Sequence, residues 1–586
     1  MLRPPFQGTL AFVLILALFT QPLPVLAQNA SADVPPITIR SSTRLVLVDV
    51  VVTDKKGQAV TGLKAEDFTV EESGKKQKVA IFVPPGVDNG PKPTPAPEGI
   101  LSNRPENVRP AGVPTILLLD ALNSPFKDQA YARSQMLKYV TEQAQAGKPI
   151  AVLTLTDQLH VLQQFTSDPQ VLLAAIKNLK PEEQILRSSG ARPESHGIST
   201  GGGGRGGDVI ANAVASATAS AQQFVDIQVA YNRERQTLIT IDAMKSLSRM
   251  LGGLPGRKHV VWLTASLPFD LLPEDRNVTD AELLAELPGQ GRQRSVSVNA
   301  AGAREAQARE LHGQQIKEAE SQLATANIAI YPVDVTGLGS GMEASAAQGG
   351  SVFADTAMTD RVISGLSTQQ SSQGTMREVA AETGGRAYYN QNEIREGIAL
   401  AAADEKASYE LGYYPDNKKW DGKFRNIKVK VAQDNIEVRY RKGYFAIEPG
   451  PGKDQNFQQD VASALQVNAP ATQISFMAQA KPTDPGKMRV VFLVDAHTIS
   501  AEDSGNGKKL NVSMFAAVYD ASGKMLGNRR TDVNNVFDAA TYQQIVEKGM
   551  MVPLDMDVPA GGKEVRLAVL DNRTGLIGTV SGPLGQ

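Results

Sequence analysis

The sequence predicts a multidomain protein in which a doubly wound, Rossmann-like α/β domain is flanked by all-β modules. Three observations support this fold class. The chain has 586 residues, more than one hydrophobic core usually organises. Between residues 114 and 405, apolar runs alternate with helical patterns, which is typical of a doubly wound domain. On both sides of that region, apolar residues follow the two-residue period of β-strands.

The composition excludes several classes of protein. The 60 basic residues nearly balance the 62 acidic ones, and the formal net charge is -2 at pH 7. A chain without excess positive charge gives no electrostatic reason to expect nucleic acid as a partner. The sequence contains no cysteine, which excludes disulfides, thiolate metal sites and a lipidated cysteine anchor.

Residues 1–27 have the order of a secretory signal peptide. Arg3 precedes an apolar run over 10–19, and the segment Val25-Leu-Ala27 follows it. This arrangement predicts cleavage near Ala27. The run is too short to span about 30 Å of hydrocarbon, and no later segment is long and apolar enough. We therefore expect a periplasmic or secreted protein without a transmembrane anchor after cleavage.

An N-terminal β-module is predicted at 34–84. The run 44–53 is rich in β-branched residues, and a strand pair around the turn at Gly74 follows it. From 85 to 113, prolines and glycines recur without periodicity. This composition predicts an extended linker.

The doubly wound domain is predicted at 114–405. Its strand candidates are the runs 115–119, 150–156, 259–263, 328–335 and 386–389. Helical patterns separate them, and one of these places four apolar residues of 241–251 on a single face. Two polar inserts, 188–207 and 268–300, interrupt the domain. The glycine cluster in the first insert predicts a flexible loop, because it lacks the preceding strand and following Lys-Ser/Thr pair of a phosphate cradle.

Strand periodicity returns after the α/β region. Between 406 and 447, Ile427 and Val429 alternate with Lys428 and Lys430, which predicts a strand with one buried face. Two arrangements remain open. These strands form either a composite β-module with 34–84, carrying the α/β domain as an insert, or a separate module. A linker at 448–470 leads to a C-terminal, Ig-like β-sandwich of about seven strands at 471–586.

The chemistry is expected at the carboxyl end of the first α/β strand. An apolar run from 114 ends in Asp120-Ala-Leu-Asn-Ser124. In α/β sheets the carboxyl ends of the strands open onto the crevice in which ligands bind. Asp120 therefore lies where recognition or catalysis is expected.

The region 44–446 resembles the VWFA-related proteins of acidobacteria, whose central domain is of the von Willebrand factor A (VWA) type. The matching segments, in order, are Val50-Val-Val-Thr-Asp-Lys-Lys-Gly57, Gly62-Leu with Asp67-Phe68, Leu119-Asp-Ala-Leu-Asn-Ser124, Pro255-Gly-Arg-Lys258, Tyr331-Pro-Val-Asp334, Thr383-Gly-Gly385, Tyr409-Glu-Leu-Gly-Tyr-Tyr-Pro415 and Arg441-Lys-Gly-Tyr-Phe445. The resemblance implies binding of a protein partner rather than catalysis.

The resemblance also implies a metal-dependent adhesion site, built from Asp-x-Ser-x-Ser, a threonine from a second loop and an aspartate from a third. Asp120 and Ser124 match the first motif, but Leu122 replaces its first serine. Thr237 and Thr240 are the candidates for the second loop. Thr264-Ala-Ser266 stands where the third-loop aspartate is expected. The standard site is therefore eroded.

A rebuilt metal site is the remaining possibility at this edge. Asp120, Ser124 and Asp334 are its candidate ligands, and Mg²⁺, or else Mn²⁺ or Ca²⁺, is the cation that such oxygens suit. Asp157 also follows a strand, but it is expected to accept hydrogen bonds within its own turn. The predicted partner-binding edge comprises Asn123, Asp157, Thr264 and Ser266.

We expect a non-enzymatic module for protein binding, adhesion or envelope assembly, with an unidentified extracytoplasmic protein as ligand. One alternative is a structural envelope protein without metal. Another is an exported hydrolase that uses Ser266, His259 and Asp270, but His259 begins the strand that Ser266 follows, so about 15 to 20 Å separates them. No Gly-x-Ser-x-Gly elbow surrounds Ser266, and the chain has no His-Glu-x-x-His run.

Overall fold

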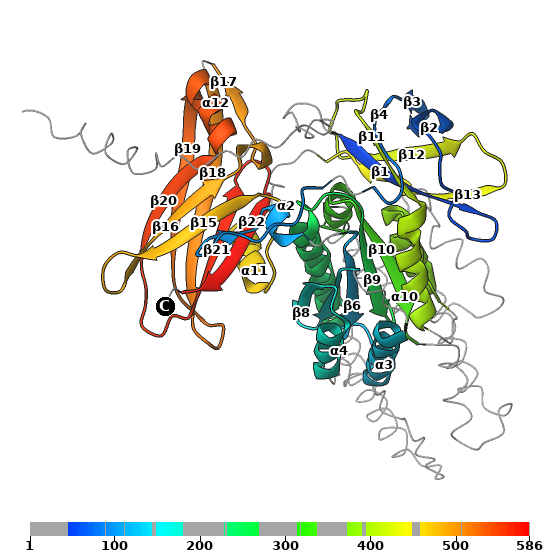
Figure 1. Cartoon of the computed structure of the whole chain (residues 1–586), viewed down its shortest axis with the longest axis horizontal. Helices are drawn as coiled ribbons and strands as arrows, with labels where there is room; N and C mark the ends of the chain where they lie inside the picture. Colours follow the sequence, from blue (N-terminus) through cyan, green and yellow to red (C-terminus); the bar gives the residue numbers. More distant parts are fainter. Residues whose placement is uncertain are drawn as a thin grey trace, which may run out of the picture. The chain divides into compact units, whose positions relative to one another are not determined.

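The structure is a computed structural model of the chain (Figure 1). It describes residues 45–87, 90–109, 112–142, 148–179, 228, 231–268, 313, 315–316, 318–336, 372–389, 394–447, 457–505 and 507–584. The predicted signal peptide at 1–27 lies outside the described residues, as do the insert 188–207 and residues 269–300 of the second insert. The described residues form a multidomain protein with one α/β domain and several β-modules.

The α/β domain contains a five-stranded sheet in the order β10-β9-β6-β7-β8. Its strands are β6 (Thr115–Asp120), β7 (Ile150–Leu155), β8 (Leu159–Thr166), β9 (Lys258–Thr264) and β10 (Ile328–Asp334). The first four in spatial order run parallel, and β8 pairs antiparallel with β7. Every residue of β6, β7, β9 and β10 is buried, which explains the continuous apolar runs in the sequence.

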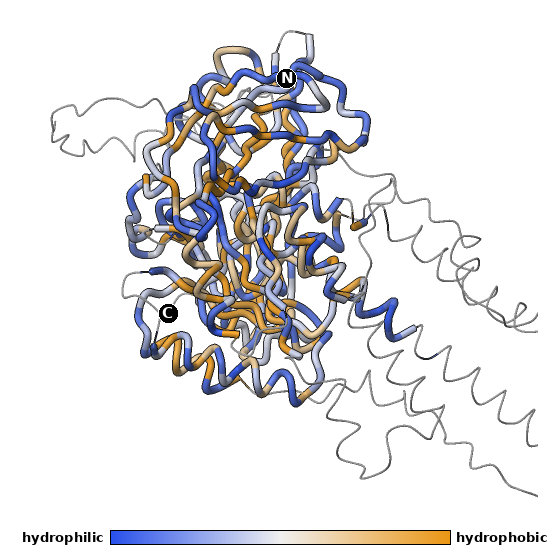
Figure 2. The backbone as a smooth tube through the Cα atoms, turned by 90° about the vertical axis from the view of Figure 1, so that its right-hand side faces the viewer, coloured by the Kyte–Doolittle hydropathy of each residue, from blue (hydrophilic) through white to orange (hydrophobic). Residues whose placement is uncertain are grey.

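Both faces of this sheet are packed. Ile116 and Leu118 of β6 belong to one core cluster, which includes apolar residues of the helical stretch 231–251. Leu117 and Leu119 belong to a second cluster with the helices α3 (Phe126–Glu142), α4 (Pro169–Asn178) and α10 (Ile394–Ala403). Figure 2 shows hydrophobic residues mainly in the strands and helices of the interior, and hydrophilic residues mainly in the turns at the periphery. Within the described residues, no helix is both long and apolar enough to span a membrane.

Two local features differ from the sequence prediction. The predicted strand 386–389 is reduced to a single parallel bridge between Tyr388 and Val333. Conversely, residues of β8 form a strand that the sequence did not suggest. β8 is an edge strand with a largely half-buried or exposed pattern, so it lacks the continuous apolar run that marks its neighbours.

Segments on either side of the α/β domain share two β-sheets. One sheet has the order β13-β1-β11-β4 and the other β14-β12-β2-β3. The strands from the N-terminal segment are β1 (Val46–Asp54), β2 (Phe68–Glu72), β3 (Lys75–Gln77) and β4 (Val79–Val83). Those from the later segment are β11 (Ser408–Tyr413), β12 (Phe424–Val431), β13 (Ile436–Arg439) and β14 (Gly443–Phe445). β1 pairs with β11 and β13, and β2 pairs with β12, so the two segments contribute to one core.

A buried ion pair links these two segments. The Glu72 carboxylate accepts hydrogen bonds from the hydroxyls of Tyr413 and Tyr444, each at 2.8 Å. Arg425 Nη1 lies 3.4 Å from the same carboxylate, and both charged side chains are buried. Burial raises the pKa of both phenols, so they remain protonated donors.

The C-terminal sandwich has two sheets. One has the order β20-β16-β15-β5, and the other has β17-β18-β21-β22, with β19 also paired to β18. Its strands are β15 (Phe476–Pro482), β16 (Lys487–Val494), β17 (Glu502–Ser504), β18 (Gly507–Tyr519), β19 (Met525–Asp538), β20 (Met550–Asp557), β21 (Glu564–Asp571) and β22 (Ile577–Pro583). The helix α12 (Ala539–Lys548) joins β19 to β20, and an apolar core is shared by both sheets.

Both predicted linkers contain regular structure. In the first, β5 (Leu101–Ser102) pairs with β15, and α2 (Pro105–Val108) follows. The Asn103 side chain donates to the carbonyls of Ala471 and Ile474 at 2.6 and 2.8 Å. These long-range hydrogen bonds hold in place a segment whose sequence shows neither helical nor strand periodicity. In the second linker, α11 (Phe457–Gln466) buries Val461, Ala464 and Leu465 in an apolar cluster.

Three short 3-10 helices complete the described elements. They are η2 (Ala65–Asp67), η3 (Asp404–Ala407) and η4 (Ala496–Thr498).

Candidate functional site

Asp120 lies at the point where the strand order of the α/β sheet reverses. From β6 the chain continues to β7 and β8 on one side, and then to β9 and β10 on the other. Ligands of α/β sheets bind at such a reversal, at the carboxyl ends of the strands. β6 ends at Asp120, and the neighbouring strand β9 ends at Thr264. These two residues therefore end neighbouring parallel strands at the same edge of the sheet.

Four protein groups donate hydrogen bonds to the buried Asp120 carboxylate. One oxygen accepts from the backbone N–H of Asn123 at 2.9 Å. The other accepts from Asn123 Nδ2 at 2.9 Å, and from Trp262 Nε1 and Thr264 Oγ1 at 3.0 Å each. Trp262 and Thr264 are two residues apart on β9, so they point to the same face of the sheet. We call these three residues the Asp120 donor shell.

Burial dominates the electrostatics of this carboxylate. Removal from water raises the pKa of Asp120, and the hydrogen bonds from Asn123, Trp262 and Thr264 oppose that rise. Three of the four groups are N–H donors of Asn123 and Trp262, which offer no lone pair to a cation, and the fourth is the Thr264 hydroxyl, which donates to the carboxylate.

The loops after β6 and β9 are tied together around the shell. Ser124 Oγ accepts from the backbone N–H of Ala265 at 2.9 Å. Gln129 Nε2 donates to the carbonyl of Ser124 at 2.9 Å. Asn123 Nδ2 also reaches Thr240 Oγ1 at 3.2 Å, so Thr240 is the second-loop candidate that meets this site. Thr237 instead lies within hydrogen-bond distance of the carbonyls of Arg233 and Pro268.

The residues present do not fit a divalent cation. Leu122, in the place of a serine ligand, is buried in an apolar core cluster. Thr264, in the place of an aspartate ligand, donates to Asp120. A cation needs lone pairs directed at it, whereas both Asp120 oxygens already face N–H or O–H groups. Within the described part of the chain, no three His, Cys, Asp or Glu side chains are grouped as metal ligands.

Asp334 is directed to its own turn rather than to Asp120. Its Oδ1 accepts from the backbone N–H and the hydroxyl of Thr336, at 2.9 and 2.6 Å. Asp334 pairs with Thr264 in the sheet, so β9 separates its strand from that of Asp120. Two strand spacings amount to about 10 Å. The three predicted ligands Asp120, Ser124 and Asp334 thus have separate hydrogen-bond partners.

The predicted partner-binding edge divides into interior and surface residues. Asn123 and Thr264 are buried within the donor shell. Ser266 is half-buried, and the Asp157 side chain is 71% exposed. Asp157 lies 3.0 Å from His160 Nε2, and this hydrogen bond lowers the pKa of the Asp157 carboxyl. Only Asp157 and Ser266 of this set are placed to contact a partner directly.

Two exposed aromatic residues at the same edge were not identified from the sequence. Phe126 begins α3, directly after the Asp120 loop, and is 51% exposed. Tyr231 is the first residue of the described helical stretch 231–251, which leads into β9, and is 59% exposed. That stretch ends before the amino end of β9, so its own start lies toward the carboxyl end of the sheet. Their exposure could not be predicted from the sequence, since both residue types are common in cores.

His259 is in an interior position. It is buried at the start of β9, and its ring packs edge-on to Tyr331, with 5.3 Å between the ring centroids. Burial lowers its pKa to about 3, so the ring is neutral at physiological pH. Neither ring nitrogen has a hydrogen-bond partner among the described residues. Asp270, the third residue of the hydrolase hypothesis, lies outside them.

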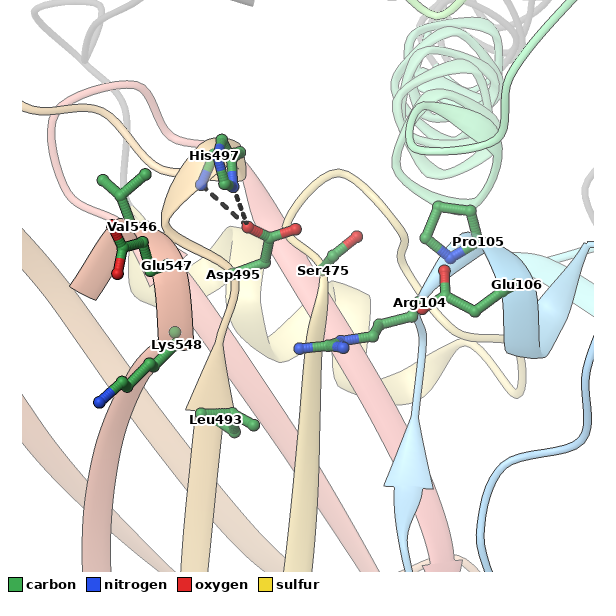
Figure 3. Close-up of a pocket in the computed structure, with 11 residues that line it drawn as sticks. Arg104, Pro105, Glu106, Ser475, Leu493, Asp495, His497, Val546, Glu547 and Lys548 are labelled. Atoms are coloured by element: carbon green, nitrogen blue, oxygen red, sulfur yellow. Dashed lines mark hydrogen bonds and ion pairs between the residues drawn. The ribbon is translucent and has the colours of Figure 1, made fainter. Parts of the chain in front are cut away.

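The C-terminal sandwich contains a cavity of about 350 Å³ that the sequence did not indicate (Figure 3). Its lining mixes charges of both signs, from Arg104, Glu106, Asp495, Glu547 and Lys548, with the imidazole of His497. Asp495 Oδ1 lies 2.8 Å from His497 Nδ1. Ser475 also lines the cavity, but its backbone N–H donates to Thr498 Oγ1, and no hydrogen bond joins it to His497 among the described residues. The cavity therefore contains a His-Asp pair without an aligned nucleophile.

Comparison with solved structures gives distant similarities, among them the following three. The chain is similar to an aerotolerance-related membrane protein from Bacteroides fragilis, with 11% identity, a TM-score of 0.23, and coverage of 50% of this chain and 100% of that one. A von Willebrand factor type A protein from Catenulispora acidiphila has 8% identity, a TM-score of 0.19, and coverage of 94% and 75%. The pilus adhesin SpaC from Lactobacillus rhamnosus GG has 8% identity, a TM-score of 0.25, and coverage of 91% and 59%.

Neither protein-family models nor curated proteins gave a match to this chain. TM-scores of the size found for the solved structures do not establish a common fold or function. The proposal below therefore rests on the molecule itself.

Proposed function

We propose that 114–405 form a VWA-type domain, doubly wound around its sheet, and that the exported chain binds a protein partner without catalysing a reaction. The observation that carries this proposal is the placement of Asp120. It ends the central strand β6 at the reversal of strand order, in a mixed sheet whose edge strand β8 is antiparallel. This is the position from which VWA domains recognise their partners in the resemblance described above.

The recognition edge works without a divalent cation in this proposal. The donor shell supplies the interactions that a metal ion supplies to the corresponding aspartate of a standard adhesion site. A partner carboxylate completing a metal coordination sphere is therefore not required. Asp120 instead holds the loops after β6 and β9 in one conformation.

The contact surface comprises the side chains that this fixed edge exposes. Phe126 and Tyr231 provide apolar area, and Asp157 and Ser266 provide polar groups. Exposed aromatic residues within a polar rim are typical of protein interfaces, where they contribute much of the binding energy. A folded protein outside the cytoplasm is the expected partner.

Capture of proteins from an envelope extract tests this function. We expect the immobilised mature chain to retain specific proteins, equally in the presence of Mg²⁺ and of EDTA. Phe126→Ala should reduce retention at least about tenfold, since truncating an aromatic hot-spot residue costs about 2 kcal/mol or more and a tenfold change corresponds to about 1.4 kcal/mol. Tyr414→Ala is the matched control, because Tyr414 is also exposed but lies outside the α/β domain.

Two outcomes would contradict the proposal. Absence of any specifically retained protein would favour the structural envelope role. Retention that Phe126→Ala and Tyr414→Ala affect equally would show that the edge carrying Phe126 does not form the contact.

A further inference from the structure

We propose that β19 pairs edge to edge with β19 of a second copy of this chain, about a two-fold axis at Thr531. This inference rests on the C-terminal sandwich and is independent of the proposed function. β19 spans 14 residues, none of them buried, and pairs with β18 along one side. β20 lies close by, but it belongs to the other sheet and pairs with β16. Among the described strands, none pairs with the outer side of β19 (Figure 1).

The orientation of the β19 backbone follows from its neighbours. Tyr519 and Asn511 of β18 accept backbone hydrogen bonds from Lys563 and Asn572, on the β21 side. Backbone groups alternate along an antiparallel strand, so the even-numbered residues between them face β19.

The pairing register of β18 with β19 shows which residues of β19 direct their backbone groups toward β18. Met514 pairs with Thr531 and Val512 with Val533, so the odd-numbered residues 529–533 of β19 direct their N–H and C=O groups inward. Their even-numbered neighbours direct theirs outward. Asn528, Arg530, Asp532 and Asn534 thus present to a further strand backbone groups that pair with none of the described strands.

If two copies of β19 pair about a two-fold axis at Thr531, the outward backbone groups of each strand form hydrogen bonds with those of the other. In that register Arg530 faces Asp532 of the second copy, and Asn528 faces Asn534. Both are pairs of outward-facing residues, as hydrogen-bonded positions of an antiparallel ladder must be. The central Thr531 pair falls at a non-hydrogen-bonded position, in agreement with its inward backbone. The four pairs between 528 and 534 form about eight backbone hydrogen bonds.

The charges of β19 select this register. Within one chain Arg530 Nε donates to Asp532 Oδ1 at 2.8 Å, and the two side chains are 41% and 49% exposed. Pairing with a second copy places each arginine beside two carboxylates and each carboxylate beside two arginines. Charges on an edge strand normally prevent pairing. Here they exclude registers with like charges opposite each other and favour the symmetric one.

A second copy is a better occupant than an unrelated strand. The outward residues are, in order, Asn528, Arg530, Asp532 and Asn534. An antiparallel second copy presents them in reverse order, so each arginine meets an aspartate and each asparagine meets an asparagine. A foreign strand would have to reproduce this pattern, whereas another copy of the chain always carries it. The resulting interface is isologous, the commonest kind in homodimers.

Sedimentation equilibrium of the mature chain tests the proposal through paired charge reversals. We expect the wild-type chain to dimerise, and Arg530→Asp and Asp532→Arg each to weaken self-association at least about tenfold, because like charges then face each other twice. A mixture of the two variants should recover the dimer as a heterodimer, since the acidic strand of one then faces the basic strand of the other. Circular dichroism confirms that each variant is folded.

Arg489→Asp and Asp555→Arg provide the matched control. These residues form an exposed pair across β16 and β20 at 2.6 Å, in the same domain but on strands that do not pair with β19. Their reversal should leave self-association unchanged. A wild-type chain that stays monomeric, or a dimer that tolerates both β19 reversals, would overturn the proposal. Failure of the mixture to associate would overturn the two-fold register.

Discussion

Replacement of Asp120 by alanine is expected to lower the free energy of unfolding of the α/β domain by about 3 to 5 kcal/mol. The substitution removes the acceptor of the Trp262 indole N–H in a buried site. It also removes one of the acceptors of the Asn123 amide and of the Thr264 hydroxyl, whose other acceptors are Thr240 Oγ1 and the Ser266 carbonyl. Each unpaired buried donor costs about 1 to 3 kcal/mol. The loss should also loosen the loops after β6 and β9, because Asn123 belongs to the first loop and Thr264 is the last residue of β9 before the second.

Tryptophan fluorescence isolates this domain. The chain has two tryptophans, and Trp420→Phe leaves Trp262 as the reporter beside Asp120. Urea unfolding of the Trp420→Phe chain with and without Asp120→Ala gives the loss in free energy of unfolding directly. Asp157→Ala is the control, since Asp157 is exposed and should change stability by no more than about 0.5 kcal/mol. A loss below about 1 kcal/mol for Asp120→Ala would contradict the structural role of the donor shell.

The second large effect is expected for Glu72→Ala, which should destabilise the sheets shared by the segments before and after the α/β domain by about 3 to 5 kcal/mol. Removal of this carboxylate leaves Arg425 with an uncompensated charge and two tyrosine hydroxyls without an acceptor. Hydrogen exchange should quicken in both β2 and β12, although about 350 residues separate them, because they pair in one sheet.

Glu71→Ala is the matched control for this experiment. Glu71 is adjacent on the same strand and pairs with Lys430 of the same partner strand at 2.8 Å, but the Lys430 side chain is exposed. A pair screened by solvent contributes about 0 to 1 kcal/mol. Equal effects of the two substitutions, or faster exchange confined to β2, would show that Glu72 does not couple the two segments.

The fold could be predicted where burial leaves a simple periodic signal. The runs that became β6, β9 and β10 are apolar throughout because helices cover both faces of their sheet. β8 and β5 left no such signal, since one is an edge strand and the other is fixed by long-range pairing with β15. α11 did leave a helical spacing at Val461 and Leu465, but the surrounding prolines and glycines favoured a linker.

The site could be predicted in location but not in its contacts. Asp120 was identified because an apolar run ends in a carboxylate, and Thr264 because it stands where an aspartate was expected. Trp262 was missed. Its contact with Asp120 depends on the pairing of β9 with β6, which places Trp262 beside Leu118. Periodicity marks a residue as buried, but the register between strands decides which polar group it meets.

Titration calorimetry with Mg²⁺ and Mn²⁺ tests most directly whether protein donors have replaced the cation at Asp120. The chain should give no one-site binding isotherm, and neither cation should raise its free energy of unfolding relative to EDTA, because the Asp120 oxygens already accept from Asn123, Trp262 and Thr264. A one-site isotherm that is present in the wild-type chain and lost in Asp120→Asn would contradict this account.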